Sequence, residues 1–159
     1  MPPNATGHVP APGTDQRPPV VVIRTIPGPP EPIFDAWLDP SSLRTWMCPG
    51  NVEYADVTVD GRPGGEFRID MHERGGQVFS HRGAYLEITR PTRLVFTWIS
   101  DATNNVASRV AVVLEARGAD TELTLSHERL PAGEAEERHR QGWTAIIEKL
   151  AGRFTSAAR

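Results

Sequence analysis

Histidines are the residues of this sequence best suited to chemistry near neutral pH, and four of them lie between positions 72 and 139. His72, His81, His127 and His139 do not share the short spacings of metal ligands, so no metal site is expected. His127 ends a run of alternating polar and apolar residues, and its parity places it on the buried side. A buried imidazole needs a hydrogen-bond partner, which is either another side chain or a ligand. His127 is therefore either a structural residue or a ligand contact.

Other reactive side chains are few, and none belongs to a known catalytic motif. The sequence contains no Gly-x-Ser-x-Gly, no paired cysteines, no phosphate-binding loop and no dinucleotide fingerprint. Cys48 lies in a predicted loop, where a reactive thiol would need a cationic neighbour to lower its pKa. Asp70, Glu73 and Glu87 are predicted on the solvent side and form no acid-base pair. We therefore expect no catalytic residue and no cofactor.

The elements that must position these residues are mostly strands. Between positions 51 and 130, apolar residues alternate with polar ones and turn residues recur at regular intervals. The predicted strands are Asn51–Asp60, Gly65–Glu73, Gln77–Thr89, Arg93–Ser100, Ala107–Arg117 and Thr121–Arg129. Their short connections favour an antiparallel meander. The alternation predicts these inward side chains: Phe67, Ile69, Met71, Leu94, Phe96, Trp98, Val110, Val112, Leu114, Leu123, Leu125 and His127.

One long helix is predicted near the end of the chain, from Pro131 to Phe154. Its apolar residues form one stripe that needs an apolar partner: Trp143, Ile146, Ile147, Leu150 and Phe154. Gly142 interrupts this pattern, and a glycine inside a helix costs about 1 kcal/mol relative to alanine. Either another segment passes close to the helix at Gly142, or the glycine is a tolerated imperfection.

The N-terminal part is predicted to change from a tail to folded structure near position 20. Residues 1–19 contain six prolines and no apolar periodicity, which predicts a disordered tail that includes His8. Val20–Ile26 is rich in β-branched residues and is predicted as a strand. Glu31–Trp46 is predicted as two short helices that separate at Asp39-Pro40, because the residue before proline avoids the α region. The predicted α+β order is βααββββββα, a curved seven-stranded antiparallel sheet wrapped around the C-terminal helix.

The composition is that of one globular domain, which we place at residues 20–154, with a second tail at 155–159. The chain of 159 residues has a formal net charge of −3 and a pI near 5.9, which argues against a nucleic-acid surface. We see no apolar run that could span a membrane and no signal-peptide pattern. The single cysteine favours a reducing cytoplasm. An open sheet edge allows a monomer or a weak homodimer.

Several short motifs follow one another between Val20 and Phe154: Phe34-Asp35-Ala36-Trp37, Asp39-Pro40 with Leu43 and Trp46, Gly64-Gly65-Glu66-Phe67, Gly83-Ala84-Tyr85-Leu86-Glu87-Ile88, Pro91-Thr92-Arg93-Leu94-Val95-Phe96-Thr97-Trp98, Thr121-Glu122-Leu123-Thr124-Leu125-Ser126-His127, and Gly142-Trp143. With the element order, they resemble the helix-grip fold of the START-like, Bet v 1-like (SRPBCC) superfamily. Within that superfamily, the sequence is similar to the family named for the C-terminal domain of the activator of heat-shock protein 90 ATPase. Fold alone does not define an activity.

The resemblance implies a cavity between the long helix and the sheet, open near the two short helices, that accepts an apolar small molecule. The residue pattern agrees, because a sheet curled around one helix cannot close tightly and small-molecule pockets are commonly lined by aromatic residues. The candidate ligand-binding residues are Trp46, Phe67, Ile69, Phe96, Trp98, Val112, Leu125, His127, Trp143 and Ile147. The alternative for each of them is that it only fills the core.

Three kinds of function are compatible with the sequence. The first is binding of an apolar small molecule without chemistry, in a stress-response or detoxification setting. The second is a cyclase- or hydrolase-type enzyme that uses the same cavity, with His127 or Tyr85 as acid or base. The third is a co-chaperone, as the family name implies, although we expect no room here for the N-terminal domain that accompanies this module in the eukaryotic activators.

Overall fold

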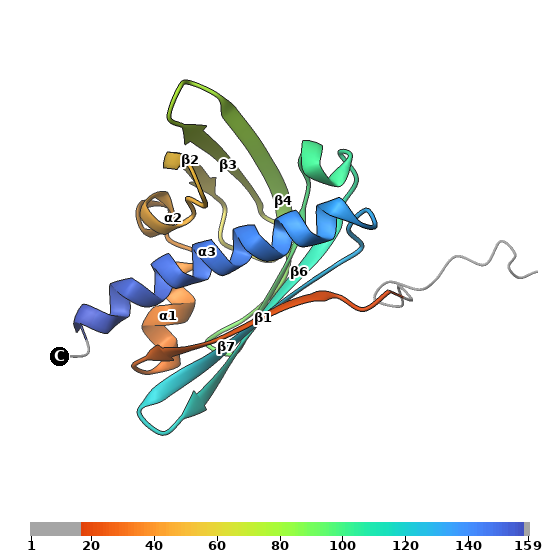
Figure 1. The fold of residues 1–159 in the computed structure, drawn as a ribbon. Helices are drawn as coiled ribbons and strands as arrows, with labels where there is room; N and C mark the ends of the chain where they lie inside the picture. Colours follow the sequence, from red (N-terminus) through yellow and green to blue (C-terminus); the bar gives the residue numbers. More distant parts are fainter. Residues whose placement is uncertain (1–16, 158–159) are drawn as a thin grey trace, which may run out of the picture.

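The computed structural model describes residues 17–157 of the chain, and side chains up to residue 154. The elements are β1 (Val20–Pro27), α1 (Pro30–Ala36), α2 (Pro40–Trp46), β2 (Val52–Val59), β3 (Glu66–Glu73), β4 (Val78–Thr89), β5 (Arg93–Trp98), η1 (Asp101–Thr103), β6 (Ser108–Arg117), β7 (Asp120–Glu128) and α3 (Glu134–Ala157). Figure 1 shows a strongly curled sheet with α3 lying along its concave side. The predicted order is confirmed, with one short 3₁₀ helix, η1, added in a predicted loop.

The seven strands form a single antiparallel sheet in the order β1-β7-β6-β5-β4-β3-β2. Strands β2 to β7 each pair with their neighbours in sequence, which confirms the predicted meander. Strand β1 closes the other side of the sheet by pairing with β7, where Val20 lies opposite His127. The first and last strands of the chain are therefore neighbours, and the α+β class and the seven-stranded sheet are confirmed.

The inner face of the sheet follows the predicted alternation. Along β7, Leu123, Leu125 and His127 are buried, whereas the residues between them are partly exposed. The same pattern buries the predicted inward residues of β3, β5 and β6. Because successive side chains of a strand point to opposite faces, this alternation is enough to build one continuous apolar surface facing α3.

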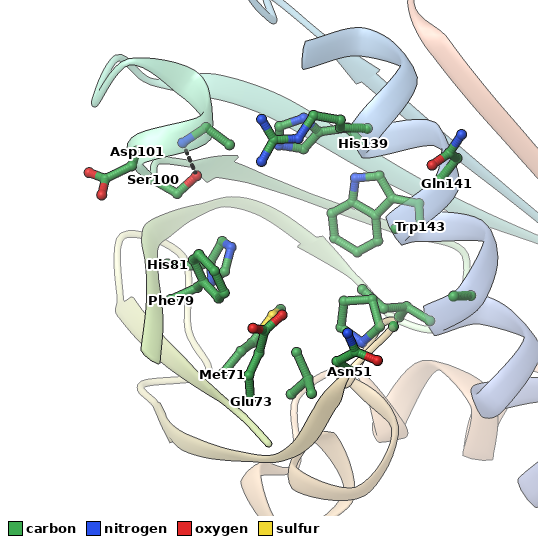
Figure 2. Close-up of a pocket in the computed structure, with 18 of the residues that line it drawn as sticks. Asn51, Met71, Glu73, Phe79, His81, Ser100, Asp101, His139, Gln141 and Trp143 are labelled. Atoms are coloured by element: carbon green, nitrogen blue, oxygen red, sulfur yellow. Dashed lines mark hydrogen bonds between the residues drawn. The ribbon is translucent and has the colours of Figure 1, made fainter. Parts of the chain in front are cut away.

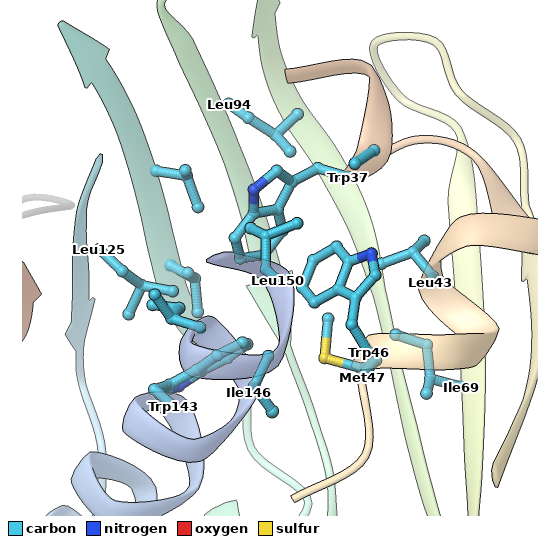
Figure 3. Close-up of a cluster of buried hydrophobic side chains, with 14 of the residues drawn as sticks. Trp37, Leu43, Trp46, Met47, Ile69, Leu94, Leu125, Trp143, Ile146 and Leu150 are labelled. Atoms are coloured by element: carbon cyan, nitrogen blue, oxygen red, sulfur yellow. The ribbon is translucent and has the colours of Figure 1, made fainter. Parts of the chain in front are cut away.

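Helices α1 and α2 cover one end of this inner face. Their separation falls where it was predicted: α1 ends at Ala36, and Asp39 begins α2 by accepting a hydrogen bond from the Ser41 amide. Trp37 and Trp46 then pack edge to face, with ring centroids 4.8 Å apart. Figure 3 shows both indoles in the same buried cluster as residues of α3 and the sheet. The two short helices therefore act as a plug for this end of the sheet.

Helix α3 provides the cover for the rest of the sheet. The predicted stripe is buried at Trp143, Ile146, Ile147 and Leu150, and Phe154 is partly buried against the core. The helix begins three residues later than predicted, at Glu134, after Gly133 with a positive φ of 84°. Apolar residues every three or four positions thus place one face of α3 on the concave sheet.

Two sets of predictions lie outside the described residues. Residues 1–16, which include His8, and residues 158–159 belong to the predicted tails, and the structure describes neither set. Residues 155–157 of the predicted C-terminal tail are helical instead, because α3 continues to Ala157, three residues past the predicted end of the helix at Phe154. In the part of the chain that is described, no helix is both long enough and apolar enough to cross a membrane.

Candidate ligand-binding pocket

A pocket of about 580 Å³ lies between α3 and strands β3 and β4. Figure 2 shows Met71, Glu73, Phe79 and His81 on the sheet side and His139, Gln141 and Trp143 on the helix side. The remaining borders are residues 49–51 after α2 with Val52 at the start of β2, and Trp98 at the end of β5 with residues 100–102 at the start of η1. None of the described residues of α1 or α2 lines this pocket, so its border is the loop that follows the short helices rather than the helices themselves.

The pocket has an apolar floor and a polar rim. Its buried residues are mostly apolar: Val52, Met71, Trp98, Ser100, Trp143 and Ile146. Its exposed residues are mostly polar: Gly50, Asn51, Phe79, Ser80, Asp101, Arg138 and Gln141. None of the buried residues in this floor is charged. Because burying an unpaired charge is costly, the deep part of the pocket favours an uncharged, apolar molecule.

One rim of the pocket is held by a reciprocal cap at η1. The Ser100 hydroxyl accepts a hydrogen bond from the Ala102 amide at 3.2 Å, the contact drawn dashed in Figure 2. The Ser100 amide in turn donates to the Thr103 hydroxyl oxygen at 3.1 Å. These bonds satisfy amides at the start of η1 that would otherwise lack a partner. The loop beside Asp101 is therefore fixed by its own sequence.

His127 is held in a hydrogen-bonded chain behind Trp143. The Trp143 indole N–H can only donate, and it donates to Nδ1 of His127 at 2.9 Å. The proton of the neutral imidazole is therefore on Nε2, which lies 2.7 Å from the Ser108 hydroxyl. That hydroxyl donates to the backbone oxygen of Trp98 at 2.6 Å. Both nitrogens are satisfied, and burial lowers the pKa of His127 well below its ordinary value.

Two other histidines lie in the pocket walls, His81 on β4 and His139 on α3. Nδ1 of His139 is 2.8 Å from the carbonyl oxygen of Ala135, so this nitrogen carries the proton and Nε2 is a free acceptor. Burial lowers the pKa of His139 and lowers that of His81 to about 4. Near neutral pH, both walls therefore present uncharged imidazoles.

The ten residues predicted to bind a ligand are divided between this pocket and the core. Trp98 and Trp143 line the pocket. Phe67, Ile69 and Phe96 border, together with Trp98, a separate crevice of only about 10 Å³ beside Trp37. The other five are fully enclosed in the core: Trp46, Val112, Leu125, His127 and Ile147. The structure thus brings two of the ten to the large pocket, and ligand contact by any of them stays a prediction.

Sequence reasoning did not single out His81, His139 or Phe79 as pocket residues. The signals were present, since Phe79 and His81 share the inward parity of Tyr85, and His139 precedes Trp143 by one helical turn. One explanation offered for Gly142 is wrong, because a Cβ atom there would meet no atom within 4 Å. No segment passes close to this glycine, and it borders the pocket instead.

Of the residues considered for chemistry, Glu73, His81 and His139 line the pocket, whereas the candidate nucleophile Cys48 and the candidate acids or bases Tyr85 and His127 do not. Cys48 is 2% exposed, and burial raises the pKa of its thiol. Burial also raises the pKa of Tyr85, which borders only the small crevice. His127 is enclosed behind Trp143 with both nitrogens bonded. Among the described residues, no three metal-ligating side chains gather at one place. The walls of the pocket therefore do not include either proposed acid or base.

A curled sheet around a C-terminal helix, with a pocket between them, defines a helix-grip protein of the START-like class. The chain belongs to the family described as Activator of Hsp90 ATPase homolog 1-like protein, whose model matches residues 27–155. This confirms the family resemblance seen in the sequence.

Solved structures agree with this fold. Protein CV1439 from Chromobacterium violaceum is 24% identical, with a TM-score of 0.79 over 86% of this chain and 96% of that one. Protein NE0264 from Nitrosomonas europaea is 23% identical, with a TM-score of 0.75 over 90% and 97%. PFC0360w, an HSP90 activator from Plasmodium falciparum, is 24% identical, with a TM-score of 0.67 over 84% and 94%. Among curated proteins, none matches this sequence.

Proposed function

We propose that this protein binds a largely apolar, uncharged small molecule in the pocket between α3 and strands β3 and β4. The observation that carries the proposal is the pocket itself, whose volume of about 580 Å³ is in the range of small-molecule sites. Its buried aromatic floor supplies apolar contact area, and its polar rim stays in contact with water. A cytoplasmic role in stress response or detoxification is part of this proposal, and the single buried cysteine supports the cytoplasm.

Binding without chemistry is favoured over an enzyme because the candidate acid and base are in the wrong place. Tyr85 and His127 lie in the core, and His127 has no free nitrogen. A general acid or base must reach the proton that it transfers. Among the described residues, no carboxylate forms a hydrogen bond with either pocket imidazole, His81 or His139, that would orient it for proton transfer. The site therefore supports recognition better than catalysis.

Blocking the pocket from the helix side tests this proposal. Gly142 borders the pocket, and a Cβ atom there would meet no atom within 4 Å, so we expect Gly142→Leu to place part of its side chain in the cavity. We expect the affinity for the neutral dye Nile red, measured by fluorescence titration, to fall by at least about tenfold. Gly152→Leu is the matched control, since Gly152 is on the same helix, is exposed and has equally open space.

The outcomes of this experiment separate binding from stability. Thermal melting of Gly142→Leu is expected to stay within a few degrees of the wild type, because Gly142 borders open space and a Cβ atom there meets no packed atom. Equal dye binding by Gly142→Leu and Gly152→Leu would contradict the proposal. Absence of dye binding by the wild-type protein, together with an apo mass in native mass spectrometry, would also contradict it.

A second candidate function is regulation of a chaperone ATPase. The family description and the similar fold of the plasmodial HSP90 activator favour it. The test is the ATPase rate of an Hsp90 with and without the purified protein. Stimulation that is unchanged by Gly142→Leu would assign a chaperone role to a surface outside the pocket.

A further inference from the structure

We propose that the pocket selects an aromatic ligand that carries a free hydroxyl group, and that this hydroxyl group forms hydrogen bonds with the pocket wall at His81 and His139. The inference rests on the proposed function, because it concerns the same pocket. It adds the chemical class of the ligand.

Aromatic rings surround the space that the ligand would occupy. Trp98 and Trp143 form part of the floor, with ring centroids 5.0 Å apart, and Phe79 lies at the rim on the sheet side. The Trp143 N–H is already bonded to His127, so this indole offers the pocket only its ring surface. Flat apolar surfaces of this kind pack best against another aromatic ring.

The imidazoles supply hydrogen-bond acceptors without charge. His139 donates through Nδ1 to Ala135, which leaves Nε2 as an acceptor. His81 faces it from β4, and its lowered pKa keeps it neutral as well. A neutral acceptor binds a hydroxyl group well, whereas a carboxylate would bring a charge next to a floor without any charged residue.

Two buried nitrogens of the pocket wall form no hydrogen bond of normal geometry with the described residues, although backbone groups of Ile69 and Phe79 lie near the His81 ring and act to raise its pKa. These nitrogens are Nδ1 of His81 and Nε1 of Trp98, on rings whose centroids are 4.8 Å apart. The indole N–H can only donate, whereas a neutral imidazole also offers a lone pair. A hydroxyl group both donates and accepts, so it can satisfy either nitrogen. Buried polar groups without partners are uncommon in native structures, and both atoms lie just beneath the surface of the pocket wall, so a ligand hydroxyl group reaches them only if the side chains around them move.

The nearby charged groups do not change this assignment. Asp70 lies on β3 and affects His81 only weakly, and Arg138 is next to His139 on the exposed side of α3. Two acidic residues border the pocket: Asp101 on η1 is exposed, and Glu73 on β3 is partly exposed. A ligand that is neutral at its buried end can therefore keep any charged substituent at the rim.

A matched pair of ligands tests the inference. Isothermal titration calorimetry near neutral pH would compare 2-naphthol with 2-methoxynaphthalene, which differs by the loss of the hydroxyl donor. We expect wild-type protein to bind 2-naphthol at least about tenfold more tightly. His81→Phe and His139→Phe are each expected to reduce this preference to less than about threefold, because they replace an acceptor by an apolar ring.

The control and the outcomes distinguish this inference from the proposed function. His72→Phe is the matched control, since His72 pairs with Asp56 and stacks on exposed Tyr54, and does not line the pocket. Its preference for 2-naphthol should equal that of the wild type. Equal affinities of wild-type protein for both naphthalenes would overturn the inference and leave binding intact. A preference that persists in both histidine variants would also overturn it. If His81→Phe does not fold, His139→Phe decides alone.

Discussion

The two ends of the inner face show how the same sheet and helix can be either closed or open. Under α1 and α2, Trp37 packs on Trp46 at 4.8 Å, and only a crevice of about 10 Å³ is left. Beside the N-terminal half of α3, a pocket of about 580 Å³ separates the helix from β3 and β4. Both regions are built from buried aromatic residues, so composition does not explain the difference.

The difference comes from the element that covers each end. Two short helices supply large side chains that fill the first region. The second region, the pocket, is bordered by loops. Gly142 is the residue of α3 that borders the pocket without contributing a side chain. The cavity is therefore a consequence of topology and of one small residue, and it should respond to substitution differently from the packed region.

The largest expected effect is on stability in the packed region. Trp46→Ala removes a fully buried indole and should lower the free energy of unfolding by about 3–5 kcal/mol. Phe79→Ala at the pocket rim should lower it by less than about 1 kcal/mol, because Phe79 is already 37% exposed. Urea denaturation of both variants measures the contrast. Similar losses would show that the rim is packed as tightly as the plug.

An intermediate effect is expected from pH, because the open end holds two histidines that resist protonation, His81 in the pocket wall and His127 behind Trp143. Burial lowers the pKa of His127 well below 6.5 and that of His81 to about 4. The unfolded chain therefore takes up protons that the native protein does not, and stability falls as the pH drops below 6.5 toward 4. Each group contributes up to about 1.4 kcal/mol per pH unit in this range.

Denaturation at a series of pH values checks this expectation. Above pH 6.5 the contribution of these groups should be constant. His81→Phe should give a shallower loss of stability on acidification than the wild type, whereas Phe79→Ala should keep the wild-type slope. An identical slope in His81→Phe would mean that His81 is protonated as easily in the native protein as in the unfolded chain.

The smallest expected effect is a gain in stability at the open end. Gly142→Ala and Gly152→Ala each add a methyl group that meets no atom within 4 Å, and each should raise the free energy of unfolding by about 0.5–1 kcal/mol. Only Gly142→Ala changes the pocket, so only this variant should weaken Nile red binding. Thermal melts combined with dye titrations measure both effects. A destabilised Gly142→Ala would show that the helix needs glycine there.

The fold could be predicted because its local signals are strong and agree with one another. Leu123, Leu125 and His127 alternate with polar residues and are buried in β7 as expected. Asp39-Pro40 marks the boundary between α1 and α2, because the Asp39 side chain caps the start of α2 and Pro40 suits its first helical position. Periodicity of this kind indicates which side of a helix or strand faces inward, and that information is sufficient to predict the architecture.

The position of the pocket could not be predicted in the same way. Trp98 and Trp143 line it, whereas Leu125 and Ile147 share their inward faces and lie in the packed core. Parity shows that a side chain faces the interior. It does not show where along its length the inner face of the sheet becomes separated from the apolar face of α3. That separation depends on the curvature of the sheet and on which loops cover its end. His81 and His139 belong to the site for this three-dimensional reason.

The hydrogen bond from Trp143 to His127 also bears on the thermodynamics of the proposed binding. The indole is fixed by 2.9 Å and 2.7 Å contacts that continue through His127 to Ser108, and all three side chains are buried. Loss of rotational freedom in this wall therefore occurs when the protein folds and does not recur when a ligand binds. Preorganised walls reduce the entropy penalty of association. For a ligand that stacks on Trp143, the favourable enthalpy of the contact is therefore offset only slightly by loss of side-chain entropy in this wall.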